Sequence, residues 1–245
     1  MSCPDCFRGF VHDGTPHGTE ITLGDSTKAY YSPPPGGADA KLPIIFYLPD
    51  VFGSQFVNSR LLADVYAKGG FHVYVVDLFN GYPLPPEPLD FMDSEPSFLG
   101  SVLLPFKFMY MAPSLVSFLG RNKEAVVLPR VMDALKGVKE KAAALGGVKI
   151  AAMGFCFGGF YAATLGKAGE VSAVGMAHPS FVTDALVAGI KVPTFFALPP
   201  TDRFMPKDAE KALAEHEKQG VRTPFLFLFL TRVILQSNCS KLTFS

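Results

Sequence analysis

The segment GFCFGG at residues 154–159 constrains the fold more than any other part of the chain. An apolar run at residues 148–153 precedes it, and a stretch of small and apolar residues with helical character follows it at 160–165. A strand, a sharp turn and a helix in direct succession present the side chain at the bend. Glycines flank such a turn because larger side chains would clash there. The side chain at the bend is Cys156, and the positive end of the following helix would favour its thiolate.

Short apolar runs alternate with helical patterns along the rest of the chain. The sequence predicts strands at residues 43–48, 71–77, 148–153, 171–177 and 192–198. It predicts helices at residues 55–68, 123–145, 160–165 and 206–219. This alternation favours an α/β fold with a mostly parallel central sheet and helices on both faces. Ligands of such sheets bind beyond the carboxyl ends of the strands.

Two segments interrupt this rhythm. Residues 82–113 are rich in proline and phenylalanine, which predicts either a lid-like insertion or an irregular segment that fills the edge of the core. Residues 223–245 form an atypical tail that begins with alternating phenylalanine and leucine. No internal repeat or low-complexity linker divides the chain, so we expect a single domain over residues 1–245.

The charge balance excludes several classes of partner. Lys and Arg together number 22, as do Asp and Glu, so no strong field attracts nucleic acid or an anionic membrane. No apolar run reaches the roughly 18 residues that a membrane-spanning helix needs. No signal peptide is visible, and the four cysteines are mostly far apart, which together favour a reducing, cytoplasmic location.

A thiol nucleophile needs a base, a group that orients the base, and donors for a developing oxyanion. The backbone N–H of Phe157 follows the thiol, and the N–H of Val51 lies in the loop after the first central strand, so we predict these two donors. Asp202 follows the last predicted strand and is the candidate acid. His178 follows the strand at 171–177 and is a candidate base, although a loop histidine that is hydrogen-bonded to the backbone is the favoured interpretation.

Several motifs together resemble the dienelactone hydrolase family of α/β-hydrolases. The resemblance covers about residues 3–222, and residues 3–18 are similar to a eukaryotic branch. The matching motifs are GFCFGG at 154–159, DVFG at 50–53, DLFNG at 77–81, HPS at 178–180 and the acid Asp202. The resemblance implies hydrolysis of small esters or lactones by a Cys-His-Asp triad without cofactor or metal, and it implies that Asp50 influences the resting thiol.

The chain departs from the family pattern after the acid. The resemblance implies a catalytic histidine in a loop beyond the last strand, but only His216 follows Asp202, within a polar helical stretch. Loss of that histidine would impair hydrolysis. For the tail after Thr223 we weigh natural divergence against an altered reading frame or mis-spliced transcript, and we favour the second because the similarity stops abruptly.

Other functions are weighed against hydrolysis. A non-catalytic small-molecule-binding protein would keep the pocket and the thiol, and a redox sensor would use Cys156 as a reversibly oxidised thiol. Cys3 and Cys6 could form half of a zinc site with His12 and His17, but their loose spacing favours ordinary free thiols, so we predict no metal. The sequence fixes neither the substrate nor the choice between monomer and homodimer.

Overall fold

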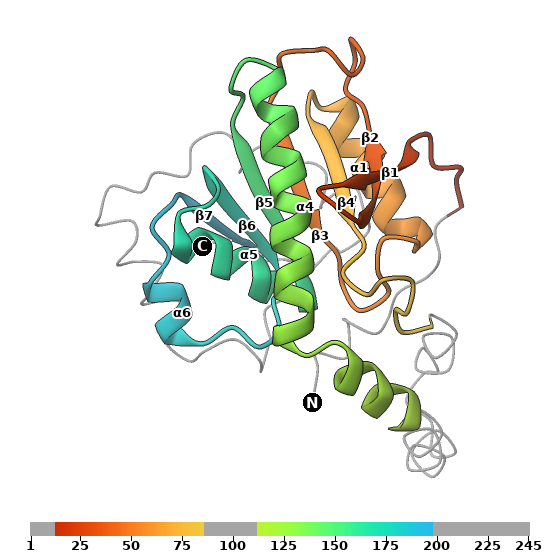
Figure 1. Ribbon diagram of the computed structural model, residues 1–245, viewed down its shortest axis with the longest axis vertical. Coiled ribbons are helices and arrows are strands. Elements are labelled where there is room, and N and C mark those ends of the chain that lie inside the picture. The colour runs from red at the N-terminus through yellow and green to blue at the C-terminus, as the bar shows by residue number, and fades with distance from the viewer. Residues whose placement is uncertain (1–12, 86–111, 198–245) are drawn as a thin grey trace.

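The computed structural model describes residues 13–85 and 112–197. Its centre is a seven-stranded sheet in the order β1-β2-β4-β3-β5-β6-β7 (Figure 1). The strands from β4 to β7 in this order pair in parallel, while β1 pairs antiparallel with β2 and β2 pairs antiparallel with β4. The strands are β1 Thr19–Leu23, β2 Thr27–Ser32, β3 Ile44–Leu48, β4 His72–Val76, β5 Ile150–Phe155, β6 Ala173–Ala177 and β7 Thr194–Ala197.

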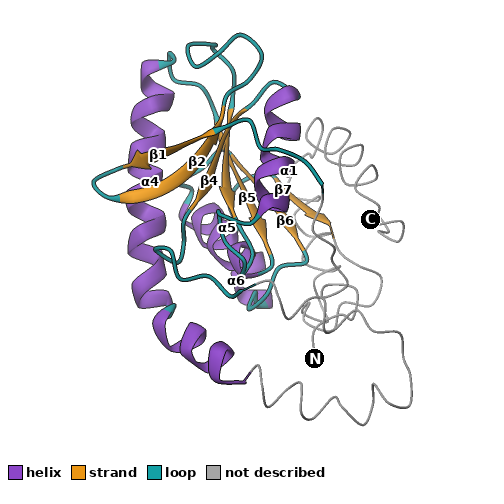
Figure 2. Cartoon of the chain, turned by 90° about the vertical axis from the view of Figure 1, so that its right-hand side faces the viewer, coloured by secondary structure: helices purple, strands orange, loops and turns teal. Residues whose placement is uncertain are grey.

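Helices cover both faces of this sheet, as the sequence predicts. Figure 2 shows α1 and α4 on opposite sides of the strands. Successive residues of a strand point to opposite faces. Accordingly Phe46 belongs to the apolar cluster under α4 and α5, while its neighbour Ile45 belongs to the cluster under α1. The labelled helices are α1 Val57–Lys68, α4 Glu124–Ala144, α5 Phe157–Ala168 and α6 Asp184–Ala188.

The apolar runs of the sequence locate the five parallel strands. The predicted and observed bounds agree to within two residues at each end wherever the structure describes them, as do those of α1 and α4. The helix after the turn begins earlier than predicted, because Phe157 already belongs to α5. The predicted helix at 206–219 and most of the insertion at 82–113 lie outside the described residues, although residues 112–121 are helical.

The sequence analysis missed the antiparallel hairpin of β1 and β2 and the short helix α6. The hairpin strands, TEITL and TKAYYS, mix polar and apolar residues and lack a continuous apolar run. β1 is the largely exposed edge strand, and β2 joins it to β4 in the antiparallel part of the sheet. They therefore lack the continuous apolar run that predicts a buried parallel strand.

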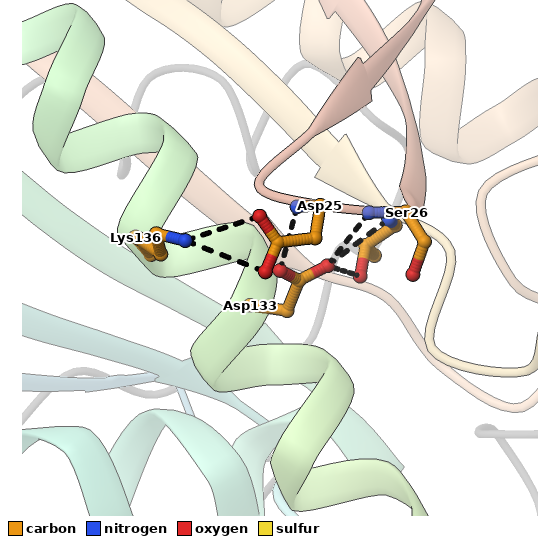
Figure 3. A network of polar contacts seen from close by, with 5 residues as sticks. Asp25, Ser26, Asp133 and Lys136 are labelled. Carbon is orange, nitrogen blue, oxygen red and sulfur yellow. Dashed lines mark hydrogen bonds and ion pairs between the residues drawn. The ribbon is translucent and has the colours of Figure 1, made fainter.

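One carboxylate fixes the hairpin to α4 (Figure 3). Asp133 accepts hydrogen bonds from the backbone N–H groups of Asp25, Ser26 and Thr27 at 2.8, 3.2 and 3.1 Å. The Thr27 hydroxyl donates to the same side chain at 2.7 Å, and Lys136 pairs with Asp25 at 3.1 Å. These hydrogen bonds, that of the Asp25 N–H foremost, lower the pKa of Asp133. The turn between β1 and β2 is thus tied to a residue more than a hundred positions away.

Candidate active site

The candidate residues gather at one edge of the sheet because neighbouring parallel strands end there. Leu48, the last residue of β3, pairs with Gly154 near the end of β5. Phe155 in turn pairs with Ala177, the last residue of β6. Asp50, Cys156 and His178 each follow one of these strand ends within two residues. The register of the sheet therefore brings them to the edge where ligands of parallel sheets bind.

Cys156 occupies a strained turn between β5 and α5. Its backbone has φ 48° and ψ −112°, a positive φ that few residues other than glycine adopt. Its N–H donates to the Ala177 carbonyl at 3.1 Å, and its own carbonyl accepts from the N–H of Gly159 at 3.0 Å. The side chain is partly buried. A bend of this kind turns the thiol away from the strand and places it beside the first turn of α5.

The glycines around the turn are required by close backbone contacts. A Cβ on Gly158 would lie 2.1 Å from the Leu48 carbonyl oxygen, and one on Gly159 would lie 2.5 Å from the Cβ of Pro179. A Cβ on Gly154 would meet the Gly158 carbonyl oxygen at 2.6 Å. These distances are too short for any other residue, so the beginning of α5 sits directly against the backbone that leads into the 50–53 loop.

Two predicted oxyanion donors lie on these adjoining segments. Phe157 is the first residue of α5, so its N–H has no acceptor within the helix. Val51 follows Asp50 in the loop after β3, and its carbonyl accepts from the N–H of Leu84 at 2.9 Å. The two residues come from segments in contact through Gly158. Their role as donors stays a prediction.

Asp50 begins the loop after β3 and is partly buried. Its side chain accepts a hydrogen bond from the N–H of Phe52 at 2.9 Å. Burial raises the pKa of Asp50 to about 6, although the N–H groups of Phe52 and Gly53 oppose the shift. A carboxyl group that titrates near neutral pH thus adjoins the turn that carries the thiol.

Aromatic rings form the wall behind the turn. The Phe157 ring lies 5.4 Å from that of Phe79 and 5.7 Å from that of Phe118, centre to centre. All three side chains are buried. On the other side Phe181 contacts Phe157 edge to face at 6.3 Å, yet remains 62% exposed. The apolar wall therefore continues from the core to the surface near the thiol.

The loop after β6 reaches back to the cysteine. The N–H of Ser180 donates to the Cys156 carbonyl at 2.9 Å, and the Ser180 Oγ lies 3.4 Å from the Cys156 Sγ. The His178 ring meets that of Phe155 edge to face at 6.4 Å, and the His178 N–H donates to the Ala197 carbonyl. The sequence analysis included Ser180 in a motif but gave it no role. Its position just beyond the end of β6 was the available signal.

The other histidines of the described residues lie elsewhere. His72 is fully buried within β4, where Tyr31 and the Ala40 carbonyl contact its two ring nitrogens. His17 is exposed beside Asp64. Asp202, the predicted acid, lies outside the described residues, as do His216 and three residues of the zinc site that was considered and not predicted, Cys3, Cys6 and His12.

The described residues offer neither a metal-binding group nor a membrane-spanning helix. Residues 13–85 and 112–197 contain no group of three His, Cys, Asp or Glu side chains that could hold a metal ion. Within the same ranges, no helix combines the length and apolar character needed to cross a bilayer. Two open hollows lie along α4, and they share Met132 in their lining.

Comparison with known proteins identifies the relatives of this chain. The model of the dienelactone hydrolase family matches residues 28–225. The hydrolase pyvD of Aspergillus violaceofuscus is 28% identical over 203 residues, which cover 83% of this chain and 72% of that protein. Dienlactone hydrolase 1 of Gibberella moniliformis is 28% identical over 211 residues, 86% of this chain and 73% of that one.

The fold also matches solved structures. A putative dienelactone hydrolase from Klebsiella pneumoniae superposes with a TM-score of 0.55 at 18% identity, covering 81% of this chain and 79% of the other. The α/β-hydrolase fold expected from the sequence is thus confirmed.

Proposed function

Because the chain belongs to the dienelactone hydrolase family, we propose that it hydrolyses small esters or lactones with Cys156 as the nucleophile. The observation that carries this proposal is the positive φ of 48° at Cys156, between β5 and α5. Such strain costs on the order of 1–3 kcal/mol and persists only where the surrounding structure enforces it. The strain serves to present the sulfur at the edge of the sheet.

In the proposed first step, the thiolate attacks the ester carbonyl carbon and a C–S bond forms. The negative charge that develops on the carbonyl oxygen is stabilised by the N–H groups of Val51 and Phe157. The C–O bond then breaks, the alkoxide or enolate leaves and takes a proton from water, and a thioester remains on Cys156. Water attacks the thioester in the second step, releasing the carboxylic acid and restoring the thiol.

The second step needs a base for water. The histidine that the family resemblance implies after Asp202 is represented only by His216, in a polar helical stretch. Of the described histidines, His178 follows the strand next to that of Cys156, so we assign it the role of base, with Asp202 as the acid that orients it. His178 does not occupy the position that the family resemblance implies for the base. We therefore expect hydrolysis of the thioester to be the slow step.

Steady-state and burst kinetics with p-nitrophenyl acetate test this proposal. We expect wild-type protein to release a burst of nitrophenolate and then turn over slowly. The Cys156→Ala variant should release nitrophenolate only at the background rate, since the nucleophile is gone. His178→Gln should keep the burst and lose turnover. Cys239→Ala, which removes another thiol, serves as the control, and equal release by wild type and Cys156→Ala would contradict the proposal.

Labelling and oxidation of Cys156 separate hydrolysis from the two alternative functions. Stoichiometric labelling of Cys156 without turnover by any substrate would favour a non-catalytic binding protein. Reversible sulfenic acid at Cys156 under mild peroxide would favour a redox sensor. A cytoplasmic location and a single domain over residues 1–245 stay predictions.

A further inference from the structure

We infer that Ser180 is a positioning residue for the nucleophile: its hydroxyl donates a hydrogen bond to the Cys156 thiolate and holds the sulfur in one orientation. The inference rests on the proposed role of Cys156. It assigns a function to a side chain that the triad of nucleophile, base and acid leaves out.

Two contacts join the residues. The Ser180 N–H donates to the Cys156 carbonyl at 2.9 Å, which fixes the backbone of one residue against the other. The Ser180 Oγ then lies 3.4 Å from the Cys156 Sγ, within hydrogen-bonding range for sulfur. Either atom can donate while the thiol is neutral. A thiolate has no proton, so in the reactive state the hydroxyl must be the donor.

The loop that carries Ser180 is itself held in place. His178 and Phe181, on either side of Ser180, have positive φ values of 39° and 62°. Pro179 lies so close to α5 that no side chain fits on Gly159. The N–H groups of His178 and Ser180 donate to the Ala197 and Cys156 carbonyls, so the loop cannot move away from the turn without breaking these hydrogen bonds. The hydroxyl is therefore positioned before substrate arrives.

A hydrogen bond to the charged form of a group favours that form. The Ser180 hydroxyl should therefore increase the thiolate fraction of Cys156 at neutral pH, in addition to the effect of the N-terminus of α5. Among the described residues, the titratable groups just after the strands that flank β5 are Asp50 after β3 and His178 after β6. The first turn of α5 contributes no acidic residue.

The pH dependence of Cys156 alkylation tests this inference. Iodoacetamide is applied to the folded, full-length protein, and mass spectrometry follows the tryptic peptide 150–167, which contains Cys156 and no other cysteine. We expect Ser180→Ala to raise the apparent thiol pKa by about one unit, so that alkylation well below that pKa slows roughly tenfold. Ser180→Thr keeps a hydroxyl and should restore most of the wild-type profile.

The control is Ser172→Ala, which removes an exposed hydroxyl directly before the first residue of β6. It should leave the pH dependence of alkylation unchanged. Circular dichroism establishes that each variant is folded. A purely structural role for Ser180 would change stability without moving the thiol pKa, so identical profiles for folded wild type and Ser180→Ala overturn the inference. Failure of Cys156 to react in either protein overturns it as well.

Alkylation needs no ester hydrolysis, so the two proposals can fail separately. Protein that alkylates with the predicted shift but releases no nitrophenolate would retain the role of Ser180 and refute hydrolysis. Protein that hydrolyses ester through Cys156, and whose thiol pKa is unchanged in Ser180→Ala, would support hydrolysis and refute the role of Ser180.

Discussion

At the scale of single residues, the site combines groups whose ionisation depends on their surroundings. The Cys156 thiol lies at a helix N-terminus beside a hydroxyl, and Asp50 lies partly buried in the adjoining loop. The helix N-terminus and the hydroxyl favour the thiolate of Cys156, whereas burial disfavours the carboxylate of Asp50. The neighbourhood of the thiol therefore changes charge near pH 6, where Asp50 titrates.

Asp50 gives a stability prediction with a definite sign. Its pKa rises from an ordinary 3.8 to about 6 in the folded protein, so the folded state binds the proton more tightly than the unfolded state. Stability should therefore fall as pH rises from about 4 to about 6, and then stay level. Asp50→Asn removes this dependence, and relative to wild type it should gain about 2 kcal/mol between pH 4 and pH 7.

Urea unfolding followed by circular dichroism at several pH values measures this difference. Asp39→Asn removes an exposed carboxylate and controls for the change in net charge. A difference between Asp50→Asn and wild type that is the same at pH 4 and pH 7 would show that Asp50 does not titrate in this range in the folded protein.

At the scale of elements, the edge hairpin depends on α4 through Asp133. Loss of this carboxylate removes the side-chain acceptor of three backbone N–H groups and leaves the Thr27 hydroxyl only the Arg130 carbonyl, at 3.4 Å. We expect Asp133→Ala to lower the free energy of unfolding by about 1–3 kcal/mol at pH 7. Because folding lowers the pKa of Asp133, its contribution is present above about pH 4 and is lost as the pH falls through the folded value.

Thermal and urea unfolding of Asp133→Ala at pH 7 and pH 3 measure both effects. Glu140→Ala changes an exposed carboxylate on the same helix and should have little effect at either pH. Equal stability of Asp133→Ala and wild type at pH 7 would mean that the hairpin does not need this anchor.

The elements also show what the sequence could predict. The turn at Cys156 is a local feature, because the strand, the glycines and the helix are consecutive, so pattern alone located it. Buried strands such as β3 and β4 are continuous apolar runs and were found for the same reason. The hairpin was not, because its short strands mix polar and apolar residues without the continuous apolar run of a buried strand.

Long-range contacts were beyond the sequence for a different reason. The approach of Ser180 to Cys156 depends on the parallel register of β5 and β6, which pairs Phe155 with Ala177. The approach of Asp133 to Thr27 depends on how α4 crosses the sheet. No pattern within either segment encodes these distances. The predicted roles of Val51, Phe157, His178 and Asp202 stay predictions.

At the scale of the whole molecule, the fold and the family agree, while the loss of the usual catalytic base stays a prediction. The family model matches residues 28–225, and the central sheet brings Asp50, Cys156 and His178 to one edge. The predicted acid Asp202 lies beyond the described residues. A scaffold that presents a thiol can take up an acyl group even where release is slow.

The most direct test of the central claim is the mass of the tryptic peptide 150–167 after brief mixing with p-nitrophenyl acetate and acid quenching. The account predicts one acetyl group on Cys156, formed during the burst of nitrophenolate and lost slowly afterwards. Nitrophenolate release with no acetyl group on this peptide at any time, or with the acetyl group on another residue, would contradict it.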